Sequence, residues 1–149
     1  TIILRYFNVY GPKQNAESNY ASAIPKFINA ALTNQSATIY DDGNQTRDFI
    51  FINDIIKANI SACLNDSKEA LANPINIGSG IQTSVNNLVK TIHNLTNTTI
   101  PPTYAPQRTG DIKHSLADIQ LSKTYLSITH PTSLKEGLKQ TIAFYKKSQ

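Results

Sequence analysis

Apolar residues recur at helical spacing in two segments of the first half of the chain. One apolar stripe runs from Tyr20 to Asn34, and a second begins after Asn53 or Asp54, either of which can cap a helix. The stripes comprise Ile24, Phe27, Ile28, Ala31 and Leu32 in the first segment, and Ile55, Ile56, Ile60, Cys63 and Leu64 in the second. The spacing therefore predicts two amphipathic helices, each with a buried apolar face.

Two further long helices are predicted in the second half. Thr83 or Ser84 can cap the first of them, and Ser133 with Glu136 forms a capping box that opens the second. Their apolar stripes are Val85, Leu88, Val89, Ile92 and Leu95, and Leu134, Leu138, Ile142 and Tyr145. A short helix is also expected from Asp118.

Short β-favouring runs alternate with these helices, at residues 2–7, 38–40, 49–52 and 74–77. Asn8 and then Gly11-Pro12 are expected to end the first run, and prolines keep residues 101–109 extended or looped. The alternation predicts an α/β fold. Because a buried parallel strand needs partners from flanking chain, we expect the opening strand to belong to the sheet of a longer protein.

Composition and charge exclude several classes of protein. The 149 residues suffice for one domain, and no apolar run is long enough for a membrane span or a signal peptide. Cys63 lies in an apolar helical pattern, so we expect a core residue, and a single cysteine favours a cytoplasmic location. Despite the formal charge of +4, no nucleic-acid interface is predicted, because the lysines are scattered singly along the chain.

Polar clusters lie between the predicted helices, where loops commonly carry function. They occur at residues 6–8, at Tyr40 with residues 45–48, at 78–80 with 83–84, and at 108–111. Each cluster alone is a weak signal, since an adjacent pair such as Arg47 and Asp48 is more often a structural ion pair than a ligand clamp. The three histidines are far apart and show no metal-ligand spacing, so no metal site is predicted.

Taken together, the clusters resemble the C-terminal half of the extended short-chain dehydrogenase/reductases that act on nucleotide sugars, especially UDP-glucose and UDP-N-acetylglucosamine 4-epimerases. The matching segments are LRYFNVYGP at 4–12, IPKFI at 24–28, IYDDGNQTRDF at 39–49, NIGSG at 76–80 and RTGD at 108–111. The resemblance continues through residues 117–118 and 136–138, so it covers nearly the whole chain. It implies a last-half strand of a Rossmann-type sheet in residues 1–12, followed by a small mixed α/β substrate-binding region in residues 13–149.

The resemblance also implies roles for individual residues. Arg47 and Arg108 match positions that bind the diphosphate, Asn8 a position that binds the sugar or its phosphate, and Phe7 a position against the nicotinamide ring of NAD. The other matching positions contact the uridine: Thr38, Ile39 and Tyr40 beside the uracil, Asp111 at a ribose hydroxyl, and Val85 and Ser115 along the nucleotide. One departure is Asp41, which stands where the family usually has a glycine. The turn would then require an aspartate to adopt a positive φ, which aspartate tolerates better than most residues.

The catalytic residues of such enzymes are not found in this sequence. Hydride transfer in the family needs a Gly-rich turn for NAD and a Tyr-x-x-x-Lys pair, and no catalytic residue is therefore assigned. We expect an NAD-binding half to precede the chain, the full enzyme to be a homodimer that epimerises UDP-sugars at C4 through a 4-keto intermediate, and this part alone to be inactive. The alternatives are a 4,6-dehydratase or decarboxylase of the same family, or a non-catalytic binding module.

Overall fold

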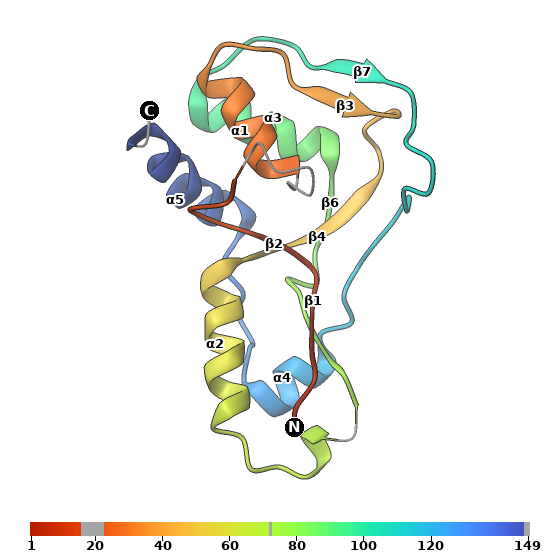
Figure 1. Ribbon diagram of the computed structural model, residues 1–149, viewed down its shortest axis with the longest axis vertical. Helices are drawn as coiled ribbons and strands as arrows, with labels where there is room; N and C mark the ends of the chain where they lie inside the picture. The colour runs from red at the N-terminus through yellow and green to blue at the C-terminus, as the bar shows by residue number, and fades with distance from the viewer. Residues whose placement is uncertain (16–22, 72, 148–149) are drawn as a thin grey trace.

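The computed structural model describes residues 1–15, 23–71 and 73–147 (Figure 1). The strands are β1 (Leu4–Tyr6), β2 (Asn8–Tyr10), β3 (Thr38–Tyr40), β4 (Thr46–Phe51), β5 (Ile75–Ile77), β6 (Gln82–Ser84) and β7 (Thr103–Ala105). The helices are α1 (Ala23–Leu32), α2 (Ile52–Cys63), α3 (Val85–Thr96), α4 (Gln120–Leu126) and α5 (Leu134–Lys147), with a 3-10 turn at Glu69–Leu71. The predicted start of the first helix, at Tyr20, lies outside the described residues.

The strands form three small sheets, ordered β1-β5, β2-β4-β6 and β3-β7. All pairs are parallel except β4 with β6, which run antiparallel from Thr46 opposite Ser84 to Asp48 opposite Gln82. Parallel pairing of strands that are separated by helices is the α/β arrangement that the sequence predicts, and the prediction of the fold class is confirmed. Strand β6 is absent from the prediction because its residues, Gln82, Thr83 and Ser84, are polar.

The opening strand changes partners at Phe7. Residues 4–6 pair with β5, the N–H of Phe7 still donates to the carbonyl oxygen of Ile77 at 3.0 Å, and from Asn8 onward the chain pairs with β4. The side-chain amide of Asn8 donates to the carbonyl oxygen of Asp48 at 3.0 Å. The prediction that Asn8 ends the strand is therefore wrong, because a polar side chain at this position bonds to the neighbouring strand while the backbone continues extended.

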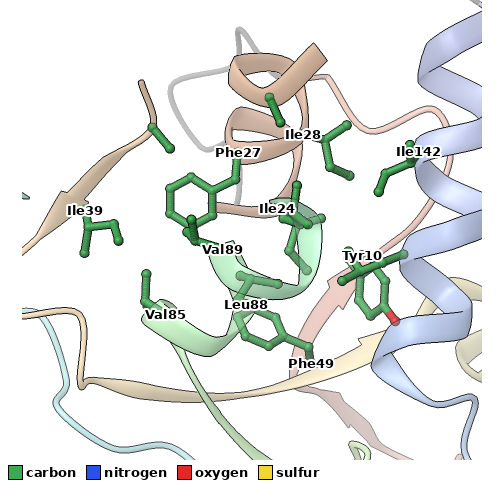
Figure 2. Packing of buried hydrophobic residues seen from close by; sticks show 14 of the residues in the cluster. Tyr10, Ile24, Phe27, Ile28, Ile39, Phe49, Val85, Leu88, Val89 and Ile142 are labelled. Carbon is green, nitrogen blue, oxygen red and sulfur yellow. The ribbon is translucent and has the colours of Figure 1, made fainter. Parts of the chain in front are cut away.

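Strand β4 lies between two hydrophobic clusters. Phe49 and Phe51 pack into the cluster built around α1, α3 and α5, whereas Ile50 packs into the cluster of α2, α4 and β5. Figure 2 shows the first cluster, in which side chains from α1, α3 and α5 meet above β4. Since successive side chains of a strand point to opposite faces, one continuous apolar run serves both clusters.

Helix α2 buries only one edge of the predicted apolar stripe, since Ile55 is buried as predicted but the other members are exposed. The helix begins at Ile52 with Phe51 as its N-cap, without a side-chain cap bond, and its buried residues are Asp54, Ile55 and Ala58. The exposed fractions are 50% for Ile56, 56% for Ile60 and 77% for Leu64, and Cys63 is exposed as well. The expectation of a core Cys63 is thus wrong. Helical spacing identifies an apolar stripe, but only the neighbouring elements decide which edge of that stripe is covered.

Helices α3 and α5 begin directly after their predicted serine caps. Ser84 caps α3 by accepting a hydrogen bond from the N–H of Asn87 at 3.2 Å, and Ser133 does the same for α5 with the N–H of Glu136 at 3.3 Å. Helix α4 begins at Gln120, two residues after the predicted Asp118. No helix in the described ranges is long and apolar enough to cross a lipid bilayer.

Candidate functional site

A cavity of about 450 Å³ opens between α1, β3, the start of β4 and the segment around residue 108. This volume falls within the ~300–1000 Å³ of small-molecule sites. Its polar or charged lining side chains are Asn8, Lys26, Ser36, Thr38, Tyr40, Gln45, Arg47, Arg108 and Asp111. Its apolar lining side chains are Ala23, Phe27, Ala30, Ala37, Phe49 and Val85.

The alternation of side chains along β4, starting one residue before the strand, determines which side chains reach the cavity. Gln45, Arg47 and Phe49 line it, whereas the intervening Thr46 and Asp48 do not. Residues two apart on a strand share a face, so Arg47 is placed in the cavity by the same alternation that buries Asp48. The neighbouring pair Arg47 and Asp48 is therefore not an ion pair, because the two side chains point to opposite faces.

Arg47 is paired with Asp111 across the cavity rim. Its Nη2 donates to the Asp111 carboxylate, and its Nη1 donates to the carbonyl oxygen of Thr46 at 2.8 Å. The exposed fractions of the two side chains are 17% for Arg47 and 34% for Asp111. A guanidinium held in place this way keeps further donors for a second anion, since it carries five N–H groups.

Arg108 lies over the ring of Tyr40, with its Cζ 3.7 Å from the ring centroid. This is cation–π geometry, which fixes the guanidinium at the mouth of the cavity. Hydrogen bonding to Arg108 and the positive charge of that residue lower the pKa of Tyr40. The charge of Lys26 on α1 lowers the pKa of Tyr40 further, so a second cation acts on the same phenol.

The turn from β3 to β4 brings Tyr40 and Gln45 together. Asp41 adopts a left-handed φ of 58° and Gly43 one of 73°, so aspartate does take the conformation that the family usually gives to glycine. Hydrogen bonds from the backbone N–H and side chain of Asn44 lower the pKa of Asp42 within this turn. The side-chain amide nitrogen of Gln45 then closes the turn by donating to the carbonyl oxygen of Tyr40 at 2.7 Å.

Seven of the predicted substrate-binding residues line the cavity: Asn8, Thr38, Tyr40, Arg47, Val85, Arg108 and Asp111. Ile39 does not, because its side chain is 1% exposed and packs in the core with Val85 and Val89 (Figure 2). Ser115 also lies outside the lining; its N–H donates to the carbonyl oxygen of Thr46 at 3.1 Å. Phe7, predicted beside the cofactor, lies between β1 and β2 and does not line this cavity either.

Three polar lining residues, Lys26, Ser36 and Gln45, were not predicted from the sequence as site residues. Gln45 could have been found, because it stands two positions before Arg47 and therefore on the same face of the strand. Lys26 lies between buried residues of α1, at a position where a solvated lysine is the ordinary expectation. The cavity thus joins three cationic side chains with one carboxylate, which favours an anionic ligand.

The loop at residues 78–80 does not fit the phosphates of a dinucleotide. The N–H groups of Ser79 and Gly80 already donate to the buried Asp48 carboxylate, at 2.7 and 2.9 Å. A Cβ at Gly78 would meet that carboxylate and Ala117, so this glycine serves close packing. Among the described residues, no group of three or more His, Cys, Asp or Glu side chains could hold a metal ion.

Comparison with known proteins places this architecture among sugar-nucleotide enzymes. The profile of the NAD dependent epimerase/dehydratase family matches residues 1–78. The UDP-N-acetylglucosamine 4-epimerase from Methanobrevibacter ruminantium M1, solved in complex with UDP-N-acetylmuramic acid, is 40% identical with a TM-score of 0.89. The matched region covers 98% of this chain and 46% of that one.

Two further relatives show the range of the similarity. A UDP-glucuronic acid 4-epimerase from Bacillus cereus, solved with UDP-glucuronic acid and NAD, is 30% identical with a TM-score of 0.88 over 99% of this chain and 46% of its own. A UDP-N-acetyl-alpha-D-glucosaminuronate decarboxylase from Bacillus cytotoxicus is 32% identical over 150 residues, 97% of this chain and 46% of its own. The chain therefore spans a little under half the length of these relatives.

Proposed function

The chain belongs to the NAD dependent epimerase/dehydratase family, and from this premise we propose that it forms the nucleotide-sugar-binding part of an enzyme that acts on UDP-sugars. The observation that carries the proposal is the convergence of Arg47 and Arg108, which are far apart in sequence, on one cavity next to β3. Two guanidinium groups at one cavity suit the diphosphate of a UDP-sugar. Each guanidinium can bind a phosphate oxygen pair through two parallel, charge-assisted hydrogen bonds.

The remaining cavity residues suit the other parts of a UDP-sugar. Thr38 and Tyr40 present a strand edge and an aromatic ring for the uracil, and Val85 supplies apolar contact beside them. Asn8, on the far side of Arg47 along the strand pair, is available for the sugar or its phosphate. On this proposal the nucleotide lies from β3 toward β2, with its diphosphate at the two arginines.

The reaction that we propose is epimerisation at C4 of the UDP-sugar. Solved relatives with this activity match the chain at 30–40% identity, which supports the assignment. The N–H groups of the 78–80 loop already bond to Asp48, so on this proposal NAD is held mainly by the part of the enzyme outside this chain, with Phe7 beside its nicotinamide ring. The similarity to a decarboxylase keeps a second reaction of the same family as the alternative.

Binding of UDP tests the proposal directly. Titration of UDP into the intact natural protein, followed by calorimetry, should give a dissociation constant that rises at least about tenfold in Arg47→Ala and in Arg108→Ala, because each loses a charge-assisted bond to the diphosphate. Arg5→Ala is the matched control, since Arg5 lies in β1 outside the cavity, beside Asn76. Equal affinities of all four proteins would contradict the proposal.

Product analysis separates the reactions. Incubation with UDP-glucose, UDP-N-acetylglucosamine and UDP-glucuronic acid should give the C4 epimer of at least one substrate, detected by NMR. Loss of carbon dioxide from the glucuronate would instead identify a decarboxylase, and a stable 4-keto-6-deoxy sugar a dehydratase.

A further inference from the structure

Gln45 carries a hydrogen-bond acceptor that the protein leaves unpaired. The residue is 7% exposed, its Nε2 donates to the Tyr40 carbonyl oxygen, and its Oε1 is buried without a partner. The assignment of Nε2 and Oε1 in the Gln45 side chain follows from this bond, because only the amide nitrogen can donate to the carbonyl oxygen of Tyr40. An unpaired buried acceptor is destabilising, so its presence at a cavity calls for a donor from elsewhere.

A second glutamine provides a comparison. Gln14 also has a buried Oε1 without a partner, and its Nε2 donates to the carbonyl oxygen of Val9 at 3.1 Å. Gln14, however, is not among the residues that line the cavity. Within the described residues, a buried amide oxygen without a partner coincides with the lining of this cavity at Gln45 alone.

The position of Gln45 indicates which donor would meet it. Its side chain is bonded to Tyr40, at the end of the cavity that we assign to the uracil, and it shares a strand face with Arg47, about 7 Å further along. Between the base and the diphosphate of any nucleotide lies the ribose. The donors that ribose offers are its 2′- and 3′-hydroxyl groups.

We propose that Gln45 Oε1 accepts a hydrogen bond from a ribose hydroxyl and thereby selects ribonucleotides. The inference rests on the proposed function, since it requires a uridine diphosphate in this cavity. Since Oε1 is closed off from solvent, this hydrogen bond requires a small shift of the Gln45 side chain toward the cavity when the nucleotide binds. A nucleotide without the hydroxyl leaves the acceptor unpaired and binds more weakly.

The test is a cycle that removes the acceptor and the donor separately. Affinities for UDP, 2′-deoxy-UDP and 3′-deoxy-UDP are measured by calorimetry on the intact natural protein and on its Gln45→Met variant, which keeps the length of the side chain. The wild type should bind one of the deoxy analogues about tenfold more weakly than UDP. The Gln45→Met variant should bind UDP and that same analogue with affinities that differ by less than about twofold.

Gln14→Met is the control, because it removes the other unpaired amide oxygen and should keep the wild-type preference. Equal binding of UDP and both analogues by the wild type would overturn the inference without any variant. A preference that survives unchanged in Gln45→Met would overturn it too, because another group would then read the ribose. In both cases UDP still binds, whereas a failure of the proposed function would abolish UDP binding by the wild type.

Discussion

Asp48 shows how one residue can organise several loops. Its side chain is fully buried, and its carboxylate accepts hydrogen bonds from the N–H groups of Ser79, Gly80 and Ala117 and from the Ser79 hydroxyl. The buried charge is tolerated because backbone donors from two distant segments surround it. The same residue fixes β4, and with it the orientation of Arg47 on the opposite face.

Asp48→Asn should lower the free energy of unfolding by about 2–4 kcal/mol, because the amide places N–H groups against donors that need an acceptor. Urea unfolding followed by circular dichroism measures the change. Asp66→Asn is the control, since Asp66 is exposed, and it should change the free energy by less than about 0.5 kcal/mol. Similar values for both variants would show that the Asp48 network contributes little.

Tyr10 makes stability sensitive to alkaline pH. Its side chain is 1% exposed, its hydroxyl donates to the carbonyl oxygen of Leu134 at 3.3 Å, and burial together with the charge of Asp54 raises its pKa above the usual 10.0. A raised pKa in the folded state means that its contribution is complete below about pH 10 and is lost as the pH rises through the folded-state pKa.

Tyr10→Phe should therefore be less stable than the wild type by about 0.5–1.5 kcal/mol near pH 7, through loss of the hydrogen bond. Above about pH 10 this difference should shrink, because phenylalanine has no proton to lose. Unfolding free energies measured from about pH 7 to pH 11 give the comparison. A difference that stays constant over this range would contradict the role of the buried phenol.

At the scale of elements, helix α3 connects the core to the site. It is entered from β6, whose residues pair with the first residues of β4, and Val85 in its first turn both packs in the core and lines the cavity. After Thr96 the helix is capped by Asn97 in the left-handed conformation, whose N–H donates to the carbonyl oxygen of His93. Both ends of α3 are thus defined by local hydrogen bonds that the sequence encodes.

Ser84→Ala should lower the free energy of unfolding by about 1 kcal/mol, because the N–H of Asn87 loses its acceptor at the start of α3. Thermal or urea unfolding measures the effect. Lys90→Ala, at an exposed position in the middle of the same helix, should change stability by less than about 0.5 kcal/mol. If the two substitutions have equal effects, the cap bond is not what stabilises the helix start.

At the scale of the whole molecule, the cavity lies at one end of the structure. It is built from α1, β3 and the start of β4, whereas α2 and α4 pack with β5 at the other end (Figure 1). The segment that supplies Arg108 and Asp111 follows β7 and is largely exposed. The pairing of β7 with β3 brings it to the cavity, where Arg108 contacts Tyr40 and Asp111 pairs with Arg47. A ligand there should act on one end more than on the other.

Hydrogen exchange with and without UDP checks this expectation. At a UDP concentration of about 100 times the dissociation constant, amides in residues 38–47 and 103–113 should exchange more slowly, because the bound state is stabilised by about 2.7 kcal/mol. Amides of α2 and α4 that exchange by local opening should keep their rates. Equal slowing of these locally opening amides in α2 and α4 would contradict binding at this end of the molecule.

Local patterns in the sequence determined much of the fold. Helices α3 and α5 follow from their apolar spacing and serine caps, and β3 and β5 lie inside the predicted β-favouring runs. These features depend on residues within a few positions of one another, so the sequence contains what is needed to predict them. The resemblance of its motifs to those of nucleotide-sugar enzymes likewise identified seven of the fifteen residues that line the cavity.

Tertiary structure alone decided features that depend on partners distant in sequence. The change of partners at Phe7, the exposed edge of α2 and the burial of Ile39 each depend on which elements pack alongside. The pairing of Arg47 with Asp111 and the unpaired oxygen of Gln45 depend on contacts across the cavity. Periodicity states how a segment folds locally, but burial and pairing arise only where separate segments meet, because those contacts are made between residues that no local pattern connects.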